Sequence, residues 1–66
     1  MEKHYIVFDG RARRDEDEAA IFEGFDSESK SSATRYFKHE YKHEDAVLFE
    51  YDVDGNNLIN GAMIAD

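Results

Sequence analysis

The sequence contains no cysteine and no proline, and only four of its residues are glycine. Without cysteine the chain can form neither a disulfide nor a zinc site built from thiolates. The absence of proline and the scarcity of glycine argue against long disordered linkers. No apolar run exceeds four residues, so no segment can cross a bilayer, and none near Met1 resembles a secretory signal. We therefore expect a cytoplasmic protein.

What the chain has in excess is acid. Its sixteen acidic residues against eight basic ones give a formal net charge of −8. This excludes sequence-independent binding to DNA or to anionic lipid as a main activity, because both need positive charge. The charge lies in blocks, with +2 over 1–14, −7 over 15–28, +3 over 29–42 and −6 over 43–66. Both acidic blocks contain predicted strands, on which charge stays fixed in space.

Sixty-six residues suffice for one small domain, 1–66, and the pattern predicts its elements. The predicted strands are 4–9, 19–25, 46–53 and 58–64, and the predicted helix covers about 27–42. Asp26 or Ser27 can cap this helix, and Asp54-Gly55 predicts a hairpin turn. The order predicts an α+β fold, a small antiparallel sheet of about four strands with one helix packed on one face. The other face must meet water or a partner.

Side-chain alternation divides the strand over 46–53 into two sets. Positions 47, 49 and 51 are apolar or aromatic and are assigned to the face beneath the helix. The intervening residues are assigned to the open face: Leu48, Glu50 and Asp52. In the second strand, Ile21, Glu23 and Phe25 are assigned to one shared side, so the open face combines carboxylates with apolar residues. The apolar residues of this expected interface are Ile21, Phe25 and Leu48.

The same alternation defines an expected core. Its members are Ile6, Phe8, Ala20, Phe22, Ala33, Phe37, Val47, Phe49 and Ile64. If this core is right, Phe49→Ala costs about 3–5 kcal/mol of stability. Leu48→Lys, in contrast, leaves the fold intact and breaks a dimer that uses the open face.

Two stretches of the sequence resemble metal-binding motifs. His39-Glu40-Tyr41-Lys42-His43 matches H-E-x-x-H, which on a helix places two zinc ligands on one side. No further histidine follows it, so a third ligand would be Glu50 or another acid, and a chain this short has no material for a substrate cleft. We expect at most adventitious zinc or nickel binding there. The stretch Asp52 to Asn56 is similar in composition to a calcium-binding loop. Neither possible alignment with such a loop, however, places both a glycine at its sixth position and a bidentate glutamate at its twelfth.

No other pattern indicates catalysis. The chain lacks a cysteine nucleophile, a G-x-S-x-G elbow and a phosphate-binding loop, so we expect no enzyme activity and no cofactor. The basic run Arg11-Ala12-Arg13-Arg14 is followed at once by four acids, Asp15 to Glu18, which cancel its field within a Debye length. We therefore expect no direct binding to nucleic acid.

A small, cysteine-free, acidic α+β chain with Glu23, Glu50, Asp52 and Asp54 on or beside strands resembles the small anti-CRISPR and antirestriction proteins of phages and mobile elements. The resemblance is one of type and rests on no diagnostic motif. It implies an inhibitor in the host-cell cytoplasm whose acidic surface imitates nucleic acid. Its partner would be a basic nucleic-acid-binding protein or complex, such as a CRISPR effector. The acids assigned to that surface are Asp15, Glu16, Asp17, Glu18, Glu23, Asp26, Glu44, Asp45, Glu50, Asp52 and Asp54.

Two other readings stay open at this point. The chain could be a homodimeric interaction module that uses its open sheet face. It could also be a soluble domain of a salt-adapted organism, in which acidity serves solubility. Light scattering tests the first reading, and the salt dependence of folding tests the second.

Overall fold

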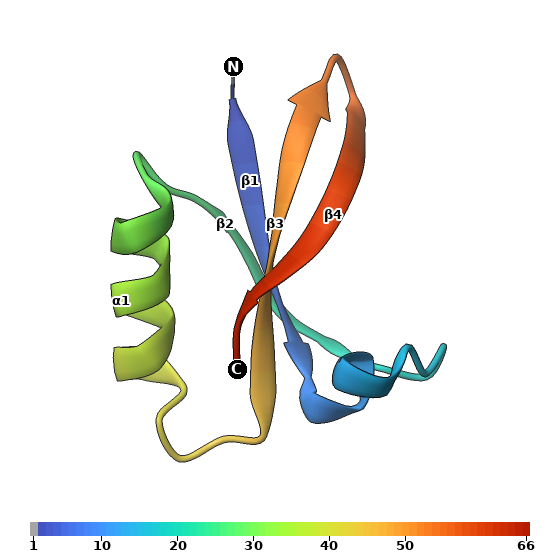
Figure 1. The fold of residues 1–66 in the computed structure, drawn as a ribbon, viewed down its shortest axis with the longest axis vertical. Helices are drawn as coiled ribbons and strands as arrows, with labels where there is room; N and C mark the ends of the chain where they lie inside the picture. Colours follow the sequence, from blue (N-terminus) through green and yellow to red (C-terminus); the bar gives the residue numbers. More distant parts are fainter. Residues whose placement is uncertain (1) are drawn as a thin grey trace.

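The computed structural model describes residues 2–66, which fold as a four-stranded sheet with one α-helix on one side (Figure 1). The elements are β1 (Lys3–Asp9), the 3-10 helix η1 (Gly10–Arg14), β2 (Ile21–Asp26), α1 (Lys30–Glu40), β3 (Ala46–Asp54) and β4 (Asn57–Ala65). Neighbouring strands are antiparallel, in the order β2-β1-β3-β4. The predicted α+β fold is confirmed, including the antiparallel pairing of the first two strands.

The connection between β1 and β2 is tied back to the sheet by Asp9. Its carboxylate accepts hydrogen bonds from the backbone N–H of Arg11 at 2.9 Å and of Ala20 at 3.2 Å, and it also binds the Arg11 guanidinium. These contacts lower the pKa of Asp9 to about 2, and the largest contribution comes from the Arg11 guanidinium. The charged stretch that follows β1 therefore begins as an ordered turn with an N-cap.

The helix is shorter than predicted. It begins after Ser29, whose hydroxyl accepts a hydrogen bond from the Ser32 N–H at 3.1 Å, so the cap is neither Asp26 nor Ser27. Ala33 and Phe37, one helical turn apart, are buried and face the sheet. This pair anchors α1 on one face of the sheet.

The buried cluster lies between α1 and that face. Its members are Tyr5, Val7, Ala33, Phe37, Ala46 and Leu48, with Phe25, Tyr41, Ile64 and Ala65 packed against it. Of the predicted core, Ala33, Phe37 and Val47 are buried, and Ile64 packs at the margin. Ile6, Phe8 and Phe49 are half-buried on the opposite face, whereas Ala20 and Phe22 are exposed. The prediction missed four buried hydrophobic residues: Tyr5, Val7, Ala46 and Leu48.

The two faces of β3 are the reverse of those predicted. Leu48 lies opposite Val7 and Glu50 lies opposite Tyr5, so both point to the helix side, where Leu48 is fully buried. The alternate residues Val47, Phe49 and Tyr51 point to the face without the helix. β2 and β3 are both antiparallel to β1, which lies between them, and α1 is therefore a crossover between parallel strands. Crossovers of this kind are almost always right-handed. The strand order together with this handedness therefore decides which face the helix covers, whatever the hydrophobicity of a single strand.

A bulge in β2 overturns a second assignment. Val7 pairs with Glu23 and Phe8 pairs with Ile21, so Phe22 is an extra residue in the ladder. One extra residue inverts the alternation. Glu23 and Phe25 therefore lie on the helix side, and Ile21 lies on the opposite face.

The hairpin of β3 and β4 contains a further irregularity. Asn60 has a φ of 56°, in the left-handed region that asparagine tolerates, and its side chain donates to Asp52 at 2.9 Å. The next residue, Gly61, lies under the ring of Tyr51, where any Cβ would collide with that ring. This glycine lets the Tyr51 ring approach the backbone of β4 closely.

Candidate functional site

The face of the sheet opposite α1 is apolar. We call it the open face and define it by Ile6, Phe8, Ile21, Val47, Phe49, Tyr51, Val53, Leu58 and Met63, which the strand registers place on one side. None of these nine residues is charged, but the same registers place His4 and Asp26, joined at 2.7 Å, at one corner of this face. Ile21, Leu58 and Met63 are 61%, 43% and 46% exposed. The open face thus leaves large apolar side chains in contact with water.

Aromatic rings form the centre of the open face. The Phe8 and Phe49 rings meet edge to face with centroids 5.2 Å apart, and Tyr51 stacks on Phe49 at 6.3 Å. At one end η1 contacts β3, and there Val47 is fully buried. The rest of the face is uncovered by any element of residues 2–66 (Figure 1).

Acidic residues lie at one margin of the open face. At one end a shallow hollow of about 300 Å³ is lined by Phe8, two alanines and three acids: Asp15, Glu16 and Asp17. At the other end Asp54 alternates with Val53 and so shares the helix side with Asp52. We call Asp15 and Asp17, both exposed, the acidic margin. The face therefore has an apolar centre and one negative end.

The strand acids that the sequence assigned to this face lie elsewhere. Glu23 accepts hydrogen bonds from the Tyr36 hydroxyl at 2.8 Å and the Tyr41 hydroxyl at 2.7 Å. Glu50 accepts one from the Tyr5 hydroxyl at 2.9 Å, and Asp52 binds Lys3 and Asn60. The expected row of outward carboxylates on the open face was wrong, since all three point to the helix side and contact neighbours within the fold.

The remaining predicted acids are scattered. Asp45 pairs with Arg13 at 3.1 Å, Glu16 with Arg14 at 3.0 Å, and Asp26 with His4 at 2.7 Å. Glu18 and Glu44 are exposed in the connections before β2 and β3. The structure thus does not bring the eleven assigned acids together on one surface.

Two of the three predicted interface residues are also misplaced. Leu48 is fully buried beneath α1, and Phe25 packs against the same cluster and stacks on Tyr5 at 5.7 Å. Only Ile21 lies on the open face. The apolar residues that sequence reasoning missed, Leu58 and Met63, lie in a strand that was predicted but whose faces were not assigned.

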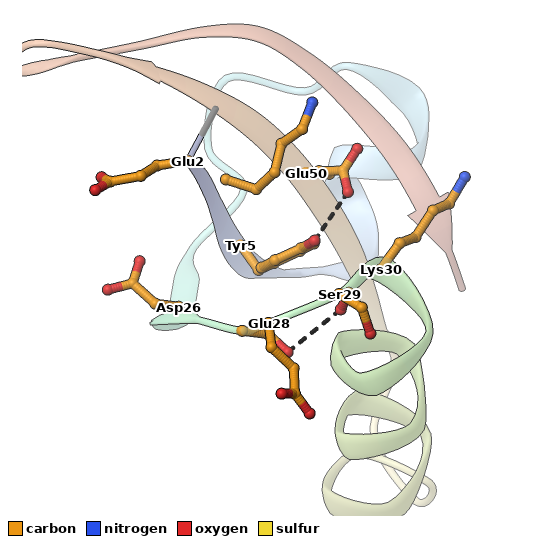
Figure 2. A pocket seen from close by; sticks show the side chains of 9 residues that line it. Glu2, Tyr5, Asp26, Glu28, Ser29, Lys30 and Glu50 are labelled. Atoms are coloured by element: carbon orange, nitrogen blue, oxygen red, sulfur yellow. Dashed lines mark hydrogen bonds between the residues drawn. The ribbon is translucent and has the colours of Figure 1, made fainter.

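A cavity of about 520 Å³ opens on the other side of the sheet, beside the start of α1 (Figure 2). Tyr5 and Glu50 point toward each other at its floor, joined by their hydrogen bond, while Glu2, Asp26 and Glu28 stand at its margin (Figure 2). Burial and then Glu50 raise the pKa of Tyr5 to about 12, so its hydroxyl stays a donor at neutral pH. This pair therefore joins β1 to β3.

The H-E-x-x-H stretch is divided by the end of the helix. α1 ends at Glu40, so His39 lies in its last turn and His43 lies in the loop beyond. Within residues 2–66, no group of three or more His, Cys, Asp or Glu side chains could hold a metal ion. The helical spacing that the motif needs is absent.

All four tyrosines have a raised pKa, which predicts an alkaline limit of stability. Burial is the largest cause of the raised pKa of Tyr5, Tyr41 and Tyr51. For Tyr36 the largest cause is its hydrogen bond to Glu23. The unfolded chain loses these protons near pH 10, before the folded chain does. Stability should therefore be fully present below pH 10 and should fall as pH rises through about 12. Tyrosinate absorbance and circular dichroism, followed together, should change in one transition. Ionisation of all four tyrosines near pH 10 with the fold intact would contradict this.

Comparison with known proteins assigns no family. No protein-family model matches the sequence, and no curated protein or solved structure is detectably similar to it. In residues 2–66, no helix has the length and apolar character that crossing a membrane requires.

Proposed function

We propose that this chain is a non-enzymatic binding module whose open face docks on a protein surface with an apolar centre and basic surroundings. One observation carries the proposal: the more apolar face of β3 is the one that α1 leaves uncovered. In a sheet covered on one side, the outward positions are ordinarily polar. Here the outward positions are Phe49, Tyr51 and Val53, in a chain with 36% charged residues.

The anatomy of this face fits an interface. Protein interfaces commonly have a desolvated apolar and aromatic centre within a polar rim. Phe49 and Tyr51 supply rigid aromatic surface at the centre, and Leu58 and Met63 extend it across β4. The acidic margin supplies the rim.

Charge selects the partner. A second copy of the chain would bring another −8 and a second acidic margin against the first, which costs electrostatic energy. A basic surface would instead be attracted over a distance and paired at the rim. Proteins that bind nucleic acid present such surfaces. A module of this kind would then exclude DNA or RNA from its partner and act as an inhibitor, with its acids at one end of an apolar face.

The test compares two exposed apolar positions on one strand. Leu58 and Ile59 are 43% and 41% exposed, but Leu58 lies on the open face and Ile59 on the helix side. Proteins retained from a lysate on the wild-type chain are identified and their affinities measured. Leu58→Ser with Met63→Ser should weaken binding about tenfold or more, whereas Ile59→Ser should change it little.

Charge provides the second arm of this test. Replacing the acidic margin by asparagine should weaken binding and flatten its salt dependence, and the retained partner should lose its nucleic acid as the complex forms. Equal losses from Ile59→Ser and from the Leu58 and Met63 variant would contradict the proposal. Light scattering that shows a wild-type dimer, broken by the Leu58 and Met63 variant, would replace the basic partner by a second copy.

A further inference from the structure

On the helix side of the edge strand β2, the hydroxyls of two tyrosines bind one carboxylate, and a third aromatic ring stacks on one of these tyrosines. Glu23 lies on β2, and Tyr36 and Tyr41 reach it from α1. The Phe22 ring stacks parallel to that of Tyr41, with centroids 6.0 Å apart. We call Phe22, Glu23, Tyr36 and Tyr41 the aromatic site. It lies on the opposite side of the sheet from the open face and does not rest on the proposed function.

The hydrogen-bond partners of this carboxylate are neutral. Its Oε1 accepts from both tyrosine hydroxyls, and the Tyr36 hydroxyl also lies 2.8 Å from Oε2. Each hydroxyl has one hydrogen, so two hydrogens serve a group that can accept about four. Within residues 2–66, no lysine, arginine or histidine forms an ion pair with Glu23. A half-buried negative charge thus retains free acceptor capacity and lacks a counter-ion.

Two of these rings reach the solvent. Phe22 is 44% exposed and Tyr36 is 39% exposed, so both present aromatic surface to the solvent. Aromatic faces carry negative potential and attract guanidinium and ammonium groups, above all quaternary ammonium. A carboxylate among such rings adds a full negative charge in a partly desolvated setting.

The β2 bulge creates this arrangement. Because Phe22 is an extra residue in the ladder, its ring lies against Tyr41 on the helix side together with Glu23. Regular alternation would have placed neighbouring residues 22 and 23 on opposite faces. Bulges commonly re-aim side chains at functional positions.

We propose that the aromatic site binds one positively charged side chain of a partner protein, a guanidinium or an ammonium group. The cation pairs with the free acceptor positions of Glu23 and lies against the rings of Phe22 and Tyr36. The two tyrosine hydroxyls hold the carboxylate in place, so little side-chain freedom is lost on binding.

The test uses short capped peptides of the form Gly-X-Gly, with X as arginine, lysine, trimethyl-lysine or citrulline. Citrulline has the shape of arginine without its charge and is the matched control. Titration is followed by NMR of the aromatic ring protons of the folded protein. The cationic peptides should shift the Phe22, Tyr36 and Tyr41 resonances to saturation, and citrulline should not. The tightest of the three cations identifies the preferred group.

Variants distinguish binding at the aromatic site from unspecific binding elsewhere on the protein surface. Glu23→Gln keeps an oxygen that accepts from the tyrosines but removes the charge, so affinity should fall about tenfold. Phe22→Leu, at an exposed position, should also weaken binding, whereas Leu58→Ser on the open face should not. The proposal is overturned if citrulline binds as well as arginine, if Glu23→Gln and Phe22→Leu both bind like the wild type, or if no cationic peptide moves these rings.

Discussion

A protein in which Leu48 is replaced by lysine should show no cooperative thermal transition at neutral pH. Leu48 is fully buried in the cluster beneath α1, opposite Val7 of β1. The substitution removes its packing and places an ammonium group in the core beneath α1. Each effect costs several kcal/mol, and the sum exceeds about 4 kcal/mol. A core of this size rarely supplies more than about 3–5 kcal/mol.

The matched control is Leu58→Lys. Leu58 is also a strand leucine, but it is 43% exposed on the open face. A lysine there keeps its ammonium in water, so the melting curve should stay close to that of the wild type. Circular dichroism against temperature measures both proteins. A folded Leu48→Lys protein would show that the helix covers the other face of the sheet.

The elements of this fold were predictable because their signals are local. The β-branched and aromatic run over 4–9, the apolar stripe through Ala33 and Phe37, and the Asp54-Gly55 turn each report on their own neighbourhood. Helix ends were less accurate, since several serines and Asp26 compete to cap the helix and only Ser29 does so. Local pattern therefore predicted the α+β architecture.

The assignment of faces failed because it depends on non-local facts. Val47, Phe49 and Tyr51 form the more apolar set of β3, and hydrophobicity alone places them in the core. The strand order, which sets the face that α1 covers, leaves no mark on the pattern of β3 itself. Once that face was misassigned, the acids of β3 and the interface position of Leu48 were misplaced with it. The extra residue Phe22 produced the same kind of error in β2.

The strongest consequence for function is that the strand acids should behave as structural residues. Reversing Glu23, Glu50 and Asp52 to lysine should destabilise the fold. The carboxylates of Glu23 and Glu50 accept bonds from tyrosines, and losing such charge-assisted bonds costs about 2 kcal/mol at each site. The two sites together lose about 4 kcal/mol, close to the whole stability of a core of this size, so the melting temperature should fall by roughly 20 °C or more. Lys3 would in addition face a new lysine at Asp52.

A control triple isolates charge from structure. Asp17, Glu18 and Glu44 are exposed, and their reversal to lysine gives the same net charge, −2, because each reversal adds two. This protein should melt within a few degrees of the wild type, since exposed charges contribute little to stability. It should still bind the basic partner more weakly, because the attraction depends on charge. If the strand triple instead kept its melting temperature and lost binding, its carboxylates would act outwardly, as an imitation of phosphates on the sheet requires.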